Sequence, residues 1–160
     1  MADRAGGVPP RDAGAHDVTE ADLLAHAQAR AAANLYWRHL GVEVVDAKPG
    51  WIRLRVPVRE ELTNAAGAPV HGGVYSALVD MAVGGALGTL HEASEGGVGQ
   101  TTLDLNVSYL AGVREGDVYA EGRIIRAGRT IAVGEGTITD GAGQTLAVGR
   151  ATYMILSKRS

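Results

Sequence analysis

The residue types best able to do chemistry lie in one stretch, VHGGVYSALVD, at positions 70–80. His71-Gly72-Gly73 opens a strongly apolar segment, so we expect these residues at the start of a buried helix. The first N–H groups of a helix have no partner inside it, and the positive end of the helix dipole lies there. Glycine at 72 and 73 leaves room for an anion, or for an oxygen that becomes anionic. The alternatives are that the glycines only allow tight packing and that His71 is a structural hydrogen-bonding residue.

Asp80 is the second feature, a carboxylate in the middle of an otherwise apolar helix. A buried and unpaired charge costs several kcal/mol, so this side chain needs a partner, water or a chemical role. One alternative is that it lies on a solvated or interface face, held by hydrogen bonds. In a chemical role, a carboxylate serves as a nucleophile or as a general base toward water.

Gly72 and Asp80 cannot serve one reaction from one helix. Eight residues of helix separate them by about 12 Å along the axis and about 80° around it, whereas reacting atoms must lie about 3 Å from both groups. If both take part, they come from two copies of the helix, antiparallel across a two-fold axis. Residues that flank Asp80 at helical spacing are small enough for that approach: Ser76, Ala77, Val83 and Gly84. This hypothesis requires at least a homodimer.

Composition and motifs exclude several other classes of function. Cysteine is absent, which excludes thiol catalysis and thiolate metal sites. The formal net charge of −3 gives no electrostatic footprint for nucleic acid. The sequence has no phosphate-binding loop and no dinucleotide-binding, zinc-protease or serine-hydrolase motif. We expect no metal site, because the histidines are not at metal-ligand spacing: His16, His26, His39, His71 and His91.

The length of 160 residues fits one domain. Residues 1–17 lack periodicity and are predicted to be a disordered tail, with a single domain over 18–160. No targeting pattern is visible, and the apolar stretch Val74–Leu90 is short for a membrane span and is interrupted by Ser76 and Asp80. We therefore expect a soluble, cytoplasmic protein with no membrane or nucleic-acid partner.

The spacing of apolar residues predicts an α+β domain. An N-terminal helix is expected over 20–40, stopped by Gly41, and a long buried helix over 72–90. Period-two alternation predicts a strand over 51–59, with Pro57 placing it near an edge or bulge. Further strands are expected over 102–109, 118–126, 130–139 and 144–156. Because tight turns join antiparallel strands, we expect a curved antiparallel sheet wrapped around the long central helix.

These patterns together resemble the hotdog-fold acyl-CoA thioesterases. The resemblance lies in His71-Gly72-Gly73, in Leu78-x-Asp80 and in the small, Gly-rich helix, and it is nearest to the phenylacetic-acid-degradation branch. It covers residues 35–156. Other matching stretches are LDLNVSYL at 103–110, Gly116-Asp117, AGRT at 127–130 and GRATY at 149–153.

The resemblance implies hydrolysis of an acyl-CoA thioester without a metal or organic cofactor. It also implies homodimers that usually pair into homotetramers. By position, Asp80 corresponds to the catalytic carboxylate of the family and Gly72 to its backbone oxyanion donor. His71 would support that turn, and Gly73 would lie against the substrate.

The resemblance also suggests residues outside the helix. Asn64 resembles a loop asparagine that contacts the carbonyl or water, and Thr102 stands where some relatives have a serine that orients water. Thr101 is a competing candidate for that position. Arg126 and Arg129, around one hairpin, would meet the phosphates of CoA, although solvated hairpin charges are an equally good interpretation.

Two other functions fit the same resemblance. A hotdog hydratase or dehydratase, acting on acyl-CoA or acyl carrier protein, needs a histidine beside the carboxylate. Here the nearby histidine, His71, lies on the loop before the helix. A non-catalytic acyl-CoA-binding sensor would keep the binding site without turnover.

Overall fold

The structure, a computed structural model, describes residues 19–91 and 99–156, so the expected tail at 1–17 and part of the loop after the long helix lie outside it. The helices are α1 (Glu20–Ala33), α2 (Leu35–Leu40), the 3₁₀ turn η1 (Glu60–Leu62) and α3 (Gly72–His91). The strands are β1 (Glu43–Lys48), β2 (Trp51–Pro57), β3 (Gly99–Tyr109), β4 (Asp117–Ala127), β5 (Ile131–Asp140) and β6 (Thr145–Leu156).

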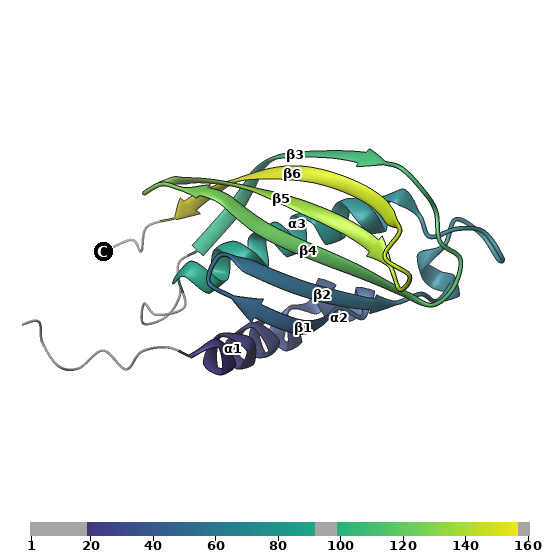
Figure 1. Ribbon diagram of the computed structural model, residues 1–160, viewed down its shortest axis with the longest axis horizontal. Coiled ribbons are helices and arrows are strands. Elements are labelled where there is room, and N and C mark those ends of the chain that lie inside the picture. Colours follow the sequence, from purple (N-terminus) through teal and green to yellow (C-terminus); the bar gives the residue numbers. More distant parts are fainter. Residues whose placement is uncertain (1–18, 92–98, 157–160) are drawn as a thin grey trace, which may run out of the picture.

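All six strands form one antiparallel sheet in the order β1-β2-β4-β5-β6-β3. Figure 1 shows the sheet curving around α3, with α1 and α2 on the β1 side. The prediction of an α+β fold, with a long helix inside a curved antiparallel sheet and an N-terminal helix, is confirmed.

Two details differ from the sequence-based expectation, and a third agrees with it. The helix expected over 20–40 is two helices, because the side chain of Asn34 accepts hydrogen bonds from the N–H groups of Tyr36 and Trp37 and so starts α2. Strand β1 was not expected, since its six residues are too few to show a clear alternation. Strand β2, which ends at Pro57, is not itself an edge, but it pairs with the edge strand β1, and the register between them shifts between Val44 and Asp46, so the expected edge or bulge lies beside it.

Helix α3 forms the centre of the core and packs closely against the sheet. A Cβ atom at Gly122 would lie 2.1 Å from the carbonyl oxygen of Ala82, so only glycine permits this approach of β4 to α3. A Cβ atom at Gly136 would lie 3.1 Å from the side chain of Val79, and one at Gly149 would lie 3.0 Å from it, so both contacts are tight. By length and composition α3 is able to cross a membrane, but 61% of its apolar 18-residue stretch is buried inside this fold.

The alternation in β2 is confirmed, since Ile52, Leu54 and Val56 are fully buried. Strand β3 differs. It is an edge of the sheet, and its apolar side chains at Leu105 and Tyr109 remain 36% and 54% exposed. One copy of the chain therefore leaves an apolar edge strand without a neighbour.

Candidate active site

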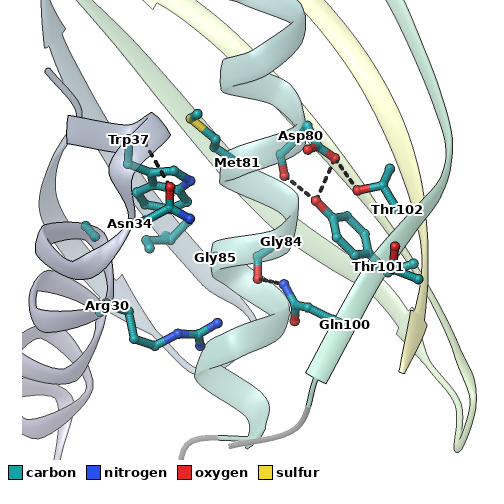
Figure 2. Close-up of a pocket in the computed structure, with 14 residues that line it drawn as sticks. Arg30, Asn34, Trp37, Asp80, Met81, Gly84, Gly85, Gln100, Thr101 and Thr102 are labelled. Atoms are coloured by element: carbon teal, nitrogen blue, oxygen red, sulfur yellow. Dashed lines mark hydrogen bonds between the residues drawn. The ribbon is translucent and has the colours of Figure 1, made fainter. Parts of the chain in front are cut away.

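Asp80 lies at a cavity of about 370 Å³ that is bounded by α1 and α2 on one side and by α3 and β3 on the other. Trp37, Ile52 and Met81 supply apolar walls, and Figure 2 shows the side chain of Trp37 facing α3. Arg30 of α1 lines the same cavity. The cavity beside the carboxylate thus has both apolar walls and polar groups, the latter including Arg30, Asn34 and Gln100.

The Asp80 carboxylate is held through one of its two oxygens. The hydroxyl of Thr102 on β3 donates to Oδ1 at 2.8 Å, and the hydroxyl of Tyr153 on β6 lies 2.6 Å from the same atom (Figure 2, dashed lines). Within the described residues, Oδ2 of Asp80 makes no hydrogen bond. Asp80 is partly exposed and lines the cavity, and Oδ2 is not among the buried side-chain atoms that lack a partner, so this oxygen is accessible.

Of the two threonines considered from the sequence, Thr102 contacts Asp80, whereas Thr101 lines the cavity without bonding to the carboxylate. Tyr153 was missed as a site residue. Its stretch, GRATY, matched the family resemblance and an alternating strand, and neither match indicates a contact with a helix residue 73 positions earlier. Burial, and then its hydrogen bond to Asp80, raise the pKa of Tyr153 well above the ordinary value of a tyrosine.

The start of α3 is arranged around His71. Nδ1 of His71 accepts a hydrogen bond from the N–H of Gly73 at 2.8 Å, and its carbonyl accepts one from Val74. The N–H of Gly72 makes no hydrogen bond within the described residues. The ring of Tyr109 covers Gly72, since a Cβ there would lie 3.3 Å from it, and its hydroxyl bonds to Ser76. The helix start thus presents one backbone donor beside an aromatic wall.

The remaining predicted residues lie elsewhere in a single chain. The side-chain amide of Asn64 donates to the carbonyl of Pro69 and closes its own loop. Arg126 and Arg129 are exposed around the β4–β5 hairpin, and neither forms an ion pair within the described residues. None of these residues, and neither Gly72 nor His71, lines the cavity at Asp80.

One stripe of α3 is incompletely covered. Gly73, Ser76, Ala77 and Asp80 follow each other at helical spacing and are all partly or fully exposed, while Val83 and Gly84 are buried. Of the small residues expected to allow a second helix to approach, Ser76 and Ala77 are therefore available and the other two pack inside the chain. The accessible stripe runs from the helix start to the carboxylate.

The donor set favours acid–base or nucleophilic chemistry over metal binding. Across residues 19–91 and 99–156, no group of three or more His, Asp or Glu side chains is placed to hold a metal ion. A carboxylate with one fixed and one accessible oxygen is suited to attack a carbonyl or to take a proton from water.

Comparisons with known proteins place this arrangement in a family. The family profile of the thioesterase superfamily matches residues 69–147, which include the start of α3 and Asp80. A Halobacterium salinarum protein, provisionally named an esterase, is 38% identical over 125 residues, covering 72% of this chain and 81% of that protein. The chain belongs to the thioesterase superfamily. Human acyl-coenzyme A thioesterase 13 is 32% identical to this chain over 113 residues. The match covers 69% of this chain and 77% of the human protein.

Solved structures show that the superfamily fold, the hotdog fold, is the fold of this chain. A Haemophilus influenzae thioesterase is 27% identical and covers 91% of this chain and 96% of its own, with a TM-score of 0.74. The PaaI protein of the E. coli phenylacetic acid degradation operon has a TM-score of 0.71 at 17% identity. The match covers 84% of this chain and 96% of that protein. A Streptococcus pneumoniae protein whose structure was determined with coenzyme A has a TM-score of 0.66 at 22% identity. The match covers 75% of this chain and 89% of that protein. At these last two identities the likeness concerns the fold alone.

Proposed function

We propose that this member of the thioesterase superfamily hydrolyses acyl-CoA thioesters to a free acid and CoA, with Asp80 as the reacting carboxylate. The observation that carries the proposal is the hydrogen-bonded carboxylate at a cavity with apolar walls, where Thr102 and Tyr153 hold one oxygen and the other is accessible. A thioester has an electrophilic carbonyl and an apolar acyl group, and this site offers a counterpart to each.

The reaction needs few groups. Asp80 either attacks the carbonyl carbon or removes a proton from the water that does so. The carbonyl oxygen becomes negative, and an N–H donor placed at that oxygen stabilises it by several kcal/mol. When the carbonyl re-forms, the C–S bond breaks and the sulfur leaves as the thiolate of CoA. A thiolate is a good leaving group, so the site needs no strong general acid.

The donor for that oxyanion is the N–H of Gly72 from a second copy of the chain. In one chain Gly72 does not line the cavity at Asp80, and about 12 Å of helix separates the two residues. A two-fold axis at the exposed stripe of α3 would bring Gly72 of each copy to Asp80 of the other. The active unit is therefore at least a homodimer, and the family pattern suggests a homotetramer.

CoA as the leaving group is supported by the human relative, which is named an acyl-coenzyme A thioesterase. The exposed Arg126 and Arg129 would bind its phosphates. Asn64 would meet the carbonyl or water from its loop. Membership of the phenylacetic-acid-degradation branch and a cytoplasmic location complete the proposal, and both derive from the sequence.

Thiol release from a panel of acyl-CoA substrates tests the reaction. The parent protein is expected to release CoA thiol from at least one short, long or aromatic acyl group. Asp80→Asn, which keeps the size of the side chain, is expected to lose most of that turnover while retaining the circular dichroism of the parent. Equal rates in both proteins would exclude Asp80, and tight CoA binding without hydrolysis would indicate a sensor.

Mixing two inactive variants tests the shared site. Gly72→Pro removes the N–H at a helix position that tolerates proline, and Asp80→Asn removes the carboxylate. A mixed dimer has one site with both groups intact, so random mixing should restore about a quarter of the parent activity. If both groups acted from the same chain, every site would remain defective and mixing would restore nothing.

A further inference from the structure

Tyr153 is the most buried polar neighbour of the reacting carboxylate. It is 5% exposed, on β6, and its hydroxyl lies 2.6 Å from Oδ1 of Asp80 and 2.7 Å from the carbonyl oxygen of the same residue. At neutral pH the hydroxyl is protonated and donates, as in any tyrosine, and burial raises its pKa further. The hydroxyl shares its single proton between two acceptors that both belong to Asp80, so the tyrosine contacts the main chain and the side chain of that residue together.

Tyr153 and Thr102 act as a pair across two strands. They are opposite each other in the register of β6 and β3, and both point to α3. Directly after Thr102 the register of β3 shifts, so the alignment of these two hydroxyls is a local arrangement at an irregular point of the strand. Two donors on Oδ1 prevent the carboxylate from rotating and leave Oδ2 as its accessible oxygen.

The space for the tyrosine hydroxyl is provided by Gly84, one turn after Asp80. A Cβ at this position would lie 2.6 Å from the Tyr153 hydroxyl oxygen. It would also lie 3.0 Å from Nε2 of Gln100, which donates to the Gly84 carbonyl at 2.7 Å. Any side chain at 84 would displace the hydroxyl from Asp80, so glycine is needed there for the contact.

We infer that Tyr153 is a positioning residue for the reaction, which with Thr102 holds Oδ1 of Asp80 so that Oδ2 is the oxygen that reacts. The inference rests on the proposed hydrolysis at Asp80 and specifies which of its oxygens attacks the carbonyl or takes the proton from water. Tyr153 also lines the cavity, and its positioning role is exerted through Asp80.

Steady-state kinetics of full-length Tyr153→Phe test this role, with the acyl-CoA that the parent hydrolyses best. The variant keeps the ring and loses the donor, so kcat should fall roughly 10- to 100-fold while KM stays within about threefold. Tyr119→Phe is the matched control, because that ring packs against Arg53 while its hydroxyl makes no hydrogen bond within the described residues. The control should keep the kcat of the parent.

Two further variants separate positioning from general stability. Gly84→Ala keeps the tyrosine and displaces its hydroxyl, so it should lower kcat in the same way. Thr102→Val removes the second donor, and the double variant with Tyr153→Phe should lose less than the product of the two single effects, because both act on one oxygen.

The outcomes distinguish this inference from the proposed function. If the parent hydrolyses acyl-CoA, Asp80→Asn does not, and Tyr153→Phe keeps the kcat of the parent, the positioning role is wrong and the proposed function stands. A fall in kcat matched by an equal rise in KM in Tyr153→Phe also overturns it. If Asp80→Asn is as active as the parent, the proposed function itself fails.

Discussion

Asp80 illustrates how one ionisable residue is accommodated in an apolar helix. Its neighbours on α3, Val79 and Met81, are buried in the core, yet Asp80 faces the incompletely covered stripe and the cavity. The cost of placing a carboxylate there is offset by two hydroxyl donors from the sheet. The residue is therefore neither fully buried nor freely solvated, and its geometry is set by groups distant in sequence.

The raised pKa of Tyr153 predicts a dependence of stability on alkaline pH. Below the ordinary tyrosine pKa of about 10, the protonated hydroxyl contributes its full stabilisation. Above that pKa, Tyr153 ionises in the unfolded chain but not in the folded chain. The free energy of unfolding therefore falls by up to about 1.4 kcal/mol per pH unit. The difference in unfolding free energy between the parent and Tyr153→Phe should thus shrink between about pH 9 and about pH 11.

Urea unfolding of both proteins at one protein concentration measures this difference. Tyr75 also has a raised pKa, but it is present in both the parent and the variant, so its contribution cancels in the comparison. A difference that is constant over this pH range would show that Tyr153 ionises equally easily in the folded chain.

At the scale of residues, the sequence predicted what local spacing determines. His71, Gly72 and Asp80 were singled out because a helix start and a mid-helix charge are recognisable in a short window. Tyr153 was not, since its contact with Asp80 depends on the register of β6 beside β3. The convergence of Gly72 on Asp80 also stays a prediction, because it requires a second copy.

At the scale of elements, the closeness of α3 to the sheet depends on glycine. The inner face of the sheet has glycine where α3 crosses it, at Gly122 on β4, Gly136 on β5 and Gly149 on β6. The Val79 side chain fills the space at two of these positions. The high glycine content, 23 of 160 residues, is explained in part by this packing.

Gly122→Ala is expected to destabilise the fold strongly. Its methyl group would overlap the carbonyl of Ala82, which belongs to a helix backbone and cannot rotate away. We expect a loss of about 3 kcal/mol or more in the free energy of unfolding, at the upper end for overpacked sites. Gly141→Ala is the control, because nothing lies within 4 Å of its added methyl, and it should change stability by less than about 0.5 kcal/mol. Equal midpoints in urea for both variants would contradict the packing argument.

The elements themselves were predicted unevenly. Long patterns, such as the apolar helix now seen as α3 and the alternation of β2, gave correct elements. The break at Asn34 was missed because alanine-rich sequence continued on its N-terminal side, and a single capping side chain decided the boundary. Strand β1 is specified by pairing with β2 and by packing against α1, and neither contact is visible in its six residues.

At the scale of the whole molecule, the edge strand β3 is the feature that a single chain leaves unfinished. It is long, and its other edge pairs with β6 along its length, apart from the irregularity between Thr102 and Asp104. Leu103 and Leu110, like Leu105 and Tyr109, are more than one-third exposed. Natural proteins rarely leave such an edge open, so a second copy on this strand and on the stripe of α3 is the arrangement that the proposed shared site requires.

Leu105→Glu is expected to weaken this association and, with it, turnover. A charge on the apolar edge would have to be buried in the dimer without a partner, which disfavours assembly. Sedimentation should show a smaller particle at micromolar concentration, with loss of thiol release in proportion to the dissociated fraction. Val45→Glu, an exposed residue of β1 on the opposite side of the sheet, is the control and should change neither. A monomeric variant with full activity would rule out a site shared between copies.

The position of Trp37 has a spectroscopic consequence. The chain has two tryptophans, of which Trp37 lines the cavity while Trp51 lies on β2 beneath the ammonium group of Lys48. An acyl group entering the cavity would displace water from the indole of Trp37 and leave Trp51 unchanged. Titration with a non-hydrolysable thioether analogue should therefore shift the intrinsic emission to shorter wavelength, and Trp37→Phe should abolish that signal. The molecule thus contains its own fluorescent reporter of occupancy, which allows binding to be measured separately from turnover.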